Sequence, residues 1–249
     1  MGLGAVGPKS RKWARTDGLS STYLEIGDTK VRLVPKRFDY GLYAFARALV
    51  DGFNHLYLRV EVIGAEKVPA PPYILSPTHR SNIDSILLGS VTHDHLRFLG
   101  KSGLWKYRSV GRLITALGGI PVNREIADRE AMDNSLAILG SGQPLVLFPE
   151  GTRKEGPRIE AILDGAAYIA LKAQVPIVPL GIAGTDKAMA KGVTFPRPAR
   201  CVVLVGDPLT EGVREAKSGS RVPRSKVREM TTELQATLQE LYDGAKGRL

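Results

Sequence analysis

Hydrophobic positions along the chain follow two different periods. From residue 58 onward, short runs rich in β-branched residues alternate with longer segments whose apolar residues recur every three or four positions. The expected strands are LRVEVIG (58–64), YILS (73–76), HLRFLG (95–100), GGIPV (118–122), PLVLF (144–148), VPIVPLGI (175–182) and ARCVVLVG (199–206). The expected helices cover residues 82–92, 103–116, 125–140, 160–174 and 223–243. This alternation predicts an α/β fold with a mixed, largely parallel sheet flanked by helices.

A different pattern precedes this region. The segment YLEIGDTKVRLVP (23–35) predicts a hairpin that turns at Gly27 and Asp28. An amphipathic helix is expected over residues 38–59, because its apolar residues recur at helical spacing. These residues are Phe38, Leu42, Phe45, Leu49, Phe53 and Leu56. We therefore expect three regions: a basic flexible tail (1–21), the hairpin with the amphipathic helix (22–59), and an α/β domain (60–249).

Composition narrows the classes of function. The 249 residues include 43% hydrophobic residues, enough for one sizeable core, and the net charge is +10. Such a charge favours anionic partners, namely nucleic acid, phosphorylated small molecules or an anionic membrane face. The single cysteine, Cys201, rules out an internal disulfide and a cysteine zinc cluster. No apolar run reaches the roughly 20 residues of a membrane-spanning helix, so we expect a soluble or membrane-surface protein.

Three expected strand-to-helix turns carry charged residues. THRSNID follows YILS, NRE follows GGIPV, and PEGTRK follows PLVLF. If these strands are parallel, all three turns open at the same edge of the sheet, where α/β proteins bind their ligands. The residues that would meet there are His79, Asp84, Arg124, Glu150 and Arg153.

The turn at 78–84 contains a histidine and an aspartate five positions apart. With Ser81 or Asn82 as the N-cap, Asp84 falls in the first turn of the next helix and can reach back to His79. A carboxylate bonded to one ring nitrogen leaves the other free to accept a proton from a substrate hydroxyl. The spacing alone also fits a histidine that makes an ordinary hydrogen bond at a helix start.

The other turns predict an anion site with Arg124 and Arg153 as clamps and the hydroxyl of Thr152 as a further donor. Lys101 is another candidate phosphate contact, with a solvated surface lysine as the alternative. Two guanidinium groups, from Arg124 and Arg153, can each bind a phosphate through paired hydrogen bonds. Gly151 permits a tight turn, and Glu150 is expected to orient Arg153 or bind a substrate hydroxyl. For each arginine taken singly, the alternative is a surface ion pair.

Other motifs carry no such prediction. GLGAVG (2–7) fits G-x-G-x-x-G, but no strand precedes it, and GKS (100–102) lacks the glycine that a phosphate-binding P-loop needs. Aromatic platforms and a basic recognition helix are also missing from the pattern, so we expect no nucleic-acid partner. We also expect neither a metal nor a cofactor.

Four blocks occur in a characteristic order: H-x-x-x-x-D (79–84), GGIPVNR (118–124), FPEGTR (148–153) and VPIVPLGI (175–182). They resemble the blocks of the glycerolipid acyltransferase family, especially bacterial 1-acylglycerol-3-phosphate acyltransferases, over about residues 55–185. The resemblance implies that His79 deprotonates an acceptor hydroxyl while Asp84 orients it. It also implies that Arg124 and the turn at 150–153 hold the acceptor phosphate, assisted by Lys101. Many relatives carry a lysine where this chain has Leu163 and Asp164, so one positive charge is missing.

The resemblance further implies the reaction and the partners. The acyl donor would be the thioester of acyl-CoA or acyl-carrier protein, and the acceptor 1-acylglycerol 3-phosphate, which would yield phosphatidic acid. Glycerol 3-phosphate as acceptor is the alternative, and a non-catalytic lipid- or nucleic-acid-binding protein is a second one. Because an acyl chain is insoluble, we expect the helix at 38–59 and the basic tail to contact anionic lipids. The protein would then be cytoplasmic and peripheral on the inner face of the cell membrane.

Overall fold

A computed structural model describes residues 23–26, 29–32, 37–122, 128–190, 192–213 and 221–249. The chain divides into two compact units, Met1–Val34 and Pro35–Leu249. In the first unit, β1 (Tyr23–Ile26) pairs antiparallel with β2 (Thr29–Arg32), which confirms the predicted hairpin. The predicted basic tail lies outside the described residues.

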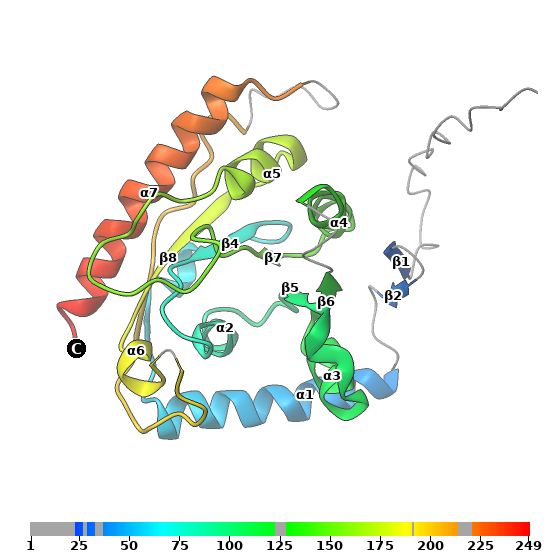
Figure 1. The fold of residues 1–249 in the computed structure, drawn as a ribbon, viewed down its shortest axis with the longest axis vertical. Coiled ribbons are helices and arrows are strands. Elements are labelled where there is room, and N and C mark those ends of the chain that lie inside the picture. Colours follow the sequence, from blue (N-terminus) through cyan, green and yellow to red (C-terminus); the bar gives the residue numbers. More distant parts are fainter. Residues whose placement is uncertain (1–22, 27–28, 33–36, 123–127, 191, 214–220) are drawn as a thin grey trace, which may run out of the picture. The chain divides into compact units, whose positions relative to one another are not determined.

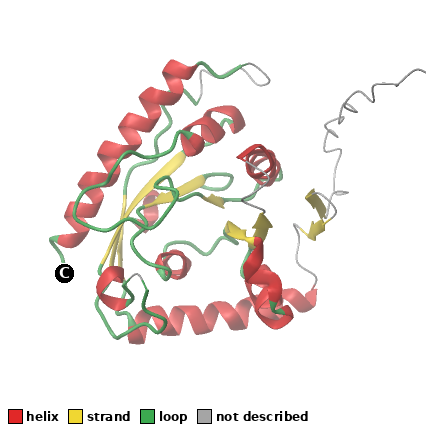
Figure 2. Ribbon diagram, viewed as in Figure 1, coloured by secondary structure: helices red, strands yellow, loops and turns green. Residues whose placement is uncertain are grey.

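The second unit is built on a seven-stranded sheet (Figures 1 and 2). Its strands are β3 (Glu61–Ile63), β4 (Ile74–Pro77), β5 (Arg97–Lys101), β6 (Gly119–Val122), β7 (Leu145–Val146), β8 (Ile177–Ala183) and β9 (Val202–Val205). The strand order is β3-β9-β8-β4-β7-β5-β6. All neighbours pair in parallel except β8 and β9, which are antiparallel. The prediction of a mixed, largely parallel sheet is therefore confirmed.

Helices cover both faces of this sheet (Figure 1). They are α1 (Arg37–Gly52), α2 (Asp84–Leu87), α3 (Arg108–Ala116), α4 (Asp128–Gly140), α5 (Gly165–Ala173), α6 (Thr185–Ala188) and α7 (Arg224–Lys246). A π-helical turn, η1 (Phe53–Tyr57), extends α1. The helices α4, α5 and α7 lie on one side of the sheet, and α1, α2 and α3 lie on the other. None of the helices in the described part of the chain has the length and apolar character needed to cross a bilayer.

One predicted helix, over 82–92, is shorter in the structure. The α-helix ends at Leu87 and continues as a 3₁₀ turn, Leu88–Ser90. Side chains from α1 and η1 take up carbonyl groups there: Arg47 donates to the carbonyls of Gly89 and Thr92 at 2.8 and 2.9 Å, and Asn54 donates to that of Ile86 at 2.9 Å. These bonds anchor α1 to the segment that immediately follows the His79–Asp84 turn.

The helix predicted over 160–174 begins later, at Gly165. The backbone before it bonds to other elements, because Ile159 donates its N–H to Gln239 of α7 and Leu163 donates its N–H to the carbonyl of Pro149. The short helix α6, which follows β8, was not predicted. The long connection from β7 to α5 therefore stays non-helical and runs along α7 (Figure 1).

Candidate active site

Two neighbouring strand ends form the core of the site. The turn after β4 carries His79, and the turn after β7, which pairs in parallel with β4, carries Glu150 and Arg153. The two turns are joined directly, since the N–H of Lys154 donates to the carbonyl oxygen of His79 at 2.9 Å. For these two turns, the prediction that they open at one edge of the sheet is confirmed. The third predicted turn, NRE (123–125), lies outside the described residues.

His79 and Asp84 lie in hydrogen-bond contact. The ring Nδ1 of His79 is 2.9 Å from Oδ2 of Asp84, whose side chain is fully buried, whereas the His79 side chain remains 21% exposed. A carboxylate facing Nδ1 assigns the ring proton to that nitrogen, so Nε2 is the proton-accepting atom of the neutral ring. The ring also packs against Phe148, with centroids 4.1 Å apart. Sequence reasoning had not singled out Phe148, although it begins the FPEGTR block.

Asp84 also organises the turn that precedes it. Its Oδ2 accepts the backbone N–H groups of Arg80 and Ser81, both at 2.7 Å. The cap position differs from the prediction, because Ile83 occupies it without a side-chain bond. The hydroxyl of Ser81 donates to the carbonyl of Met189 at 2.7 Å, and its Oγ accepts the N–H of Ile83 at 3.5 Å. The carboxylate of Asp84 thus replaces a conventional cap by folding the turn back on itself.

Glu150 faces the protein interior. Its Oε1 accepts the backbone N–H of His79 at 2.7 Å, and its Oε2 lies 3.1 Å from Nη1 of Arg80. The side chains of Glu150 and Arg80 are 0% and 2% exposed. Burial raises the pKa of Glu150, and the bonds from His79 and Arg80 act in the opposite direction. The structure therefore gives Glu150 a contact that positions His79 rather than a contact with phosphate.

Arg80 connects this turn to the C-terminal helix. Its Nη2 donates to the carbonyl of Arg158 at 3.2 Å, and its guanidinium carbon lies 4.8 Å from the ring centroid of Tyr242 on α7. The Arg80 guanidinium is buried and lies over the Tyr242 ring, and its charge is matched by Glu150. We therefore assign Arg80 a structural role and not the binding of an anionic ligand. The sequence analysis did not identify Arg80 as a site residue, and its position directly after His79 is the one signal that could have indicated it.

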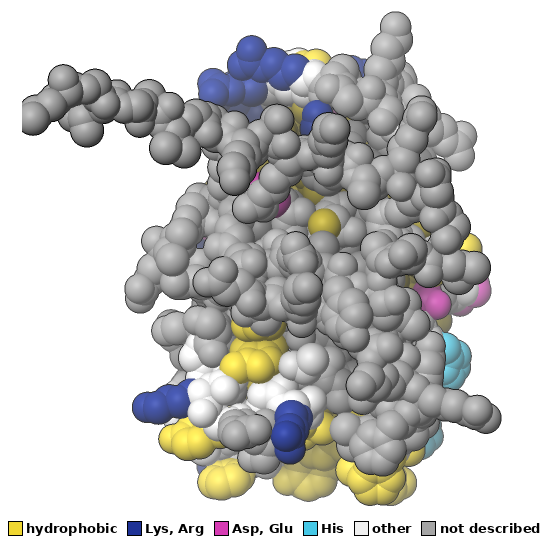
Figure 3. Space-filling view, turned by 90° about the vertical axis from the view of Figure 1, so that its right-hand side faces the viewer, with side chains coloured by type: hydrophobic (Ala, Val, Ile, Leu, Met, Phe, Trp, Pro, Cys, Tyr) yellow, Lys and Arg dark blue, Asp and Glu magenta, His cyan; other side chains and the backbone are white. Residues whose placement is uncertain are grey.

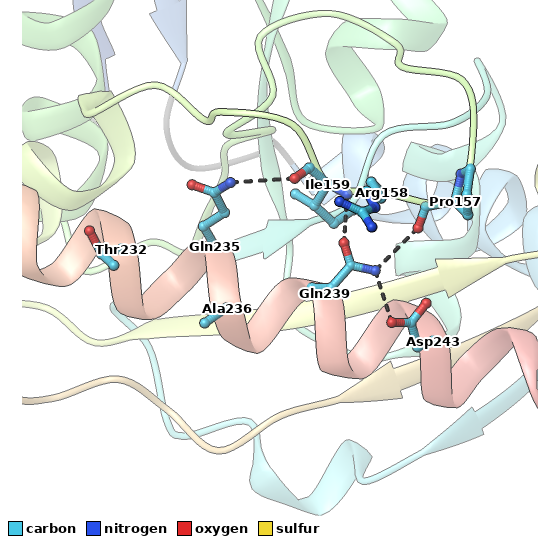
Figure 4. A pocket seen from close by; sticks show the side chains of 8 residues that line it. All are labelled: Pro157, Arg158, Ile159, Thr232, Gln235, Ala236, Gln239 and Asp243. Atoms are coloured by element: carbon cyan, nitrogen blue, oxygen red, sulfur yellow. Dashed lines mark hydrogen bonds between the residues drawn. The ribbon is translucent and has the colours of Figure 1, made fainter.

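The segment 157–159 is fastened to α7 through its backbone (Figure 4). Gln239 accepts the N–H of Ile159 at 2.7 Å and donates to the carbonyl of Pro157 at 3.1 Å, while Gln235 donates to the carbonyl of Ile159 at 3.3 Å. These residues line an open pocket on the surface of α7. The pocket contains none of the predicted site residues, so we place the chemistry at His79 and not there.

The turn after Glu150 requires a glycine. Gly151 has a φ of +69°, and a Cβ at this position would lie 2.8 Å from Cδ1 of Leu163. Thr152 is exposed and Arg153 is half-buried, so both lie at the surface beside the His79 turn. Leu163 is 62% exposed and covers this glycine.

The remaining predicted phosphate residues are Lys101 and Arg124. Lys101 is the last residue of β5, which lies between β7 and β6. Arg124 lies outside the described residues, two positions beyond the end of β6. Because β5 and β6 are parallel to β7, their carboxyl ends open on the side of the sheet that carries His79.

Similarity to known proteins agrees with this arrangement. The family model described as Acyltransferase matches residues 59–183. The chain is 32% identical over 174 residues to 1-acyl-sn-glycerol-3-phosphate acyltransferase alpha of Mus musculus, covering 67% of this chain and 61% of that protein. It is 27% identical over 140 residues to a chloroplastic 1-acyl-sn-glycerol-3-phosphate acyltransferase of Brassica napus, covering 55% of this chain and 40% of that protein. The chain thus spans only part of the length of these two relatives.

A bacterial relative and a crystal structure extend the match. Over 202 residues the chain is 23% identical to 1-acyl-sn-glycerol-3-phosphate acyltransferase of Bacillus subtilis, covering 80% of this chain and 96% of that protein. The crystal structure of PlsC, the 1-acyl-sn-glycerophosphate acyltransferase of Thermotoga maritima, shares the fold with a TM-score of 0.63 at 22% identity, over 82% of this chain and 79% of that one. The family model covers the His79–Asp84 pair, the Glu150–Arg153 turn and half of the sequence, and the chain therefore belongs to the acyltransferase family.

Proposed function

We propose that the protein transfers a fatty acyl chain from acyl-CoA or acyl-carrier protein to the free hydroxyl of 1-acylglycerol 3-phosphate, forming phosphatidic acid. The observation that carries the proposal is the oriented His79–Asp84 pair, joined to the Glu150–Arg153 turn at one sheet edge. The names of the related proteins, each a 1-acyl-sn-glycerol-3-phosphate acyltransferase, support this choice of acceptor.

The reaction needs one proton acceptor and no protein nucleophile. Nε2 of His79 removes the proton of the acceptor hydroxyl as its oxygen attacks the thioester carbonyl carbon. The resulting tetrahedral intermediate collapses, the carbon–sulfur bond breaks, and the imidazolium returns the proton to the thiolate. The buried carboxylate of Asp84 stabilises the imidazolium that forms in between.

The phosphate of the acceptor would bind beside this pair. Arg153 and Thr152 present surface groups next to the His79 turn, and Lys101 and Arg124 follow the neighbouring parallel strands. A guanidinium holds a phosphate through two parallel hydrogen bonds and keeps its charge at every working pH. Arg153→Ala is therefore expected to raise the KM for the phosphorylated acceptor by about tenfold to a hundredfold, with a smaller effect on the KM for the thioester.

Membrane contact would use the face of α1 and η1 that points away from the sheet. Phe45, Leu49 and Leu56 are 63%, 59% and 83% exposed, although they lie on an element whose other side is bonded to the 86–92 segment. Large apolar side chains in a row on a surface helix are suited to the interface of a bilayer. We propose that this face rests on the cytoplasmic surface of the cell membrane.

The proposal is tested by the products that the purified protein forms. We would supply acyl-CoA with 1-acylglycerol 3-phosphate, glycerol 3-phosphate, or an equal mixture of both, and identify the lipids by mass spectrometry. Phosphatidic acid as the main product of the mixture is expected. Acylation of glycerol 3-phosphate alone would assign the alternative acceptor, and hydrolysis without transfer to either would contradict the proposal.

A further inference from the structure

We propose that the loop 192–197 is a second membrane anchor, which inserts Phe195 into the bilayer next to the face of α1 and η1. The inference rests on the membrane-docking part of the proposed function and extends it to a separate segment. Phe195 is 79% exposed and Val193 is 37% exposed, and both lie outside the hydrophobic core. Transfer of an exposed phenylalanine side chain from water to an apolar environment is favourable, so contact with a lipid bilayer would stabilise this position.

The exposed ring belongs to a loop that is held in place. The N–H of Arg197 donates to the carbonyl of Ala188 at 2.7 Å, and that of Val193 donates to the carbonyl of Ala190 at 3.1 Å. The hydroxyl of Tyr57 donates to the carbonyl of Pro196 at 3.0 Å. These bonds on both sides of Phe195 fix the backbone, so the loop presents the ring outward as a defined feature.

The same bonds place the loop beside the first anchor and the catalytic turn. Tyr57 belongs to η1 and stacks on Phe53, and its neighbour Leu56 is the most exposed large apolar residue of that element. On the other side, the hydroxyl of Ser81 donates to the carbonyl of Met189 at 2.7 Å, and Met189 lies six residues after β8 ends at Ala183. A loop inserted here would bring the His79 turn close to the lipid surface.

Exposed cationic side chains lie on the segments that are bonded to the apolar tip. Arg59, Lys187 and Arg197 are exposed on the segments joined by these bonds, against one exposed acidic residue, Asp186. Each basic residue near an anionic lipid surface contributes about 1 kcal/mol of attraction. An apolar tip with such surroundings fits a bilayer that contains anionic lipid.

A third segment with exposed apolar side chains lies at the other end of α1. Tyr107 and Leu113, at the start of and within α3, are 67% and 46% exposed, and Lys106 and Arg112 beside them are exposed cations. In Figure 1, α3 and the 192–200 connection lie towards opposite ends of α1. Figure 3, which views the molecule from the α3 side, shows hydrophobic side chains at its lower edge with basic side chains among them. Apolar side chains contributed by three separate segments, spread along the length of α1, favour a broad lipid surface over a single protein groove.

The inference is tested by binding to vesicles of phosphatidylcholine with about one-third phosphatidylglycerol. Phe195→Ser is expected to weaken partitioning about tenfold, because one large apolar side chain no longer inserts. Phe195→Leu should keep most of the binding, and Thr194→Ser, a matched change at the neighbouring exposed residue, should leave it unaltered. Binding is measured without substrates, so its outcome is independent of acyl transfer. The fold of each variant is checked by its thermal unfolding.

A fluorescent label reports insertion directly. Because Cys201 is buried, a thiol-reactive, environment-sensitive dye should label only the new cysteine of the Phe195→Cys variant. The control is Ala236→Cys, on the exposed side of α7. Blue-shifted emission with vesicles is expected at 195 and not at 236. If Phe45→Ser abolishes binding while Phe195→Ser does not, docking by α1 stands and the second anchor is refuted. Loss of self-association in Phe195→Ser, with unchanged vesicle binding, would assign the loop to contact with a second copy.

Discussion

At the scale of residues, two buried carboxylates fix one histidine from two directions. Asp84 holds the ring through Nδ1, and Glu150 holds the backbone through the N–H of the same residue. In the proposed mechanism His79 is the general base, and such a base works only when its accepting atom is placed against the substrate proton, so both contacts would bear on catalysis. The guanidinium of Arg80 forms an ion pair with Glu150 and so favours its charged carboxylate. A charged carboxylate accepts the N–H of His79 in a stronger hydrogen bond than a neutral carboxyl group would.

The ring contact predicts a large effect of Asp84→Asn on the rate. An amide does not hold the Nδ1–H as a carboxylate does and does not stabilise the imidazolium, so kcat should fall by about 10²- to 10⁴-fold. Steady-state kinetics with acyl-CoA and 1-acylglycerol 3-phosphate would measure this loss, and circular dichroism would verify the fold. A well-folded variant that retains the normal kcat would show that the pair is structural.

The backbone contact predicts that Glu150→Gln lowers both stability and kcat. Breaking a buried ion pair by removing one charge costs about 3–5 kcal/mol, because Arg80 is left unmatched in the interior. Urea unfolding and kinetics would measure the two losses. The matched control is Glu160→Gln, which removes an exposed partner of Lys154 and should change neither quantity. Equal effects of the two substitutions would contradict the positioning role.

Cys201 predicts a pH-dependent property. Burial, aided by the charges of Asp84 and Asp186, raises the pKa of its thiol from 9.0 to about 12. The native thiol should therefore resist alkylation at pH 8 and react only after unfolding. Since the pKa is higher in the folded state, this group's contribution to stability is complete below pH 9 and declines as the pH rises towards 12. Rapid labelling of the native protein by a maleimide would disprove this burial.

At the scale of elements, the spacing of hydrophobic residues predicted where the strands lie but did not predict where two of the helices begin and end. All seven strands of the large sheet were predicted, because each carries a short apolar run that the sheet buries. The ends of α2 and α5 were missed, since bonds from Arg47 and Gln239 in distant elements decide where those helices stop or start. No local pattern encodes such partners, whose positions depend on tertiary packing.

The contact between α7 and β8 predicts a strong effect of a single methyl group. A Cβ at Gly181 would meet backbone atoms of Leu241 and lie 2.6 Å from the backbone nitrogen of Tyr242, and backbone cannot yield as a flexible side chain can. Gly181→Ala should lower the free energy of unfolding by about 1–3 kcal/mol or more. Chemical denaturation would show this.

The control for that substitution is Gly140→Ala at the end of α4. Nothing lies within 4 Å of the added Cβ there, so alanine should leave stability equal or slightly higher. If Gly181→Ala proved as harmless as Gly140→Ala, α7 would not be packed against the sheet as described. That result would also remove the support that Tyr242 gives to Arg80.

At the scale of the whole molecule, some residues of the site could be predicted from the sequence and others could not. His79, Asp84 and the 150–153 turn follow parallel strands, so their meeting at one edge could be predicted from the order of elements. The helix α7 was also predicted, over 223–243, but its contact with Arg80 through Tyr242 could not be, because the two residues are far apart in the sequence and meet only through tertiary packing. The inward orientation of Glu150 also required the structure, since a carboxylate beside a glycine turn is equally suited to bind substrate.

The central claim is that Nε2 of His79 accepts the proton of an acceptor hydroxyl during acyl transfer. It is tested most directly by measuring free thiol released from acyl-CoA by the wild type and by His79→Ala, with and without 1-acylglycerol 3-phosphate. We expect acceptor-dependent release from the wild type, equal in amount to the phosphatidic acid formed, and none above background from the folded variant. Normal acceptor-dependent release by His79→Ala would contradict the account.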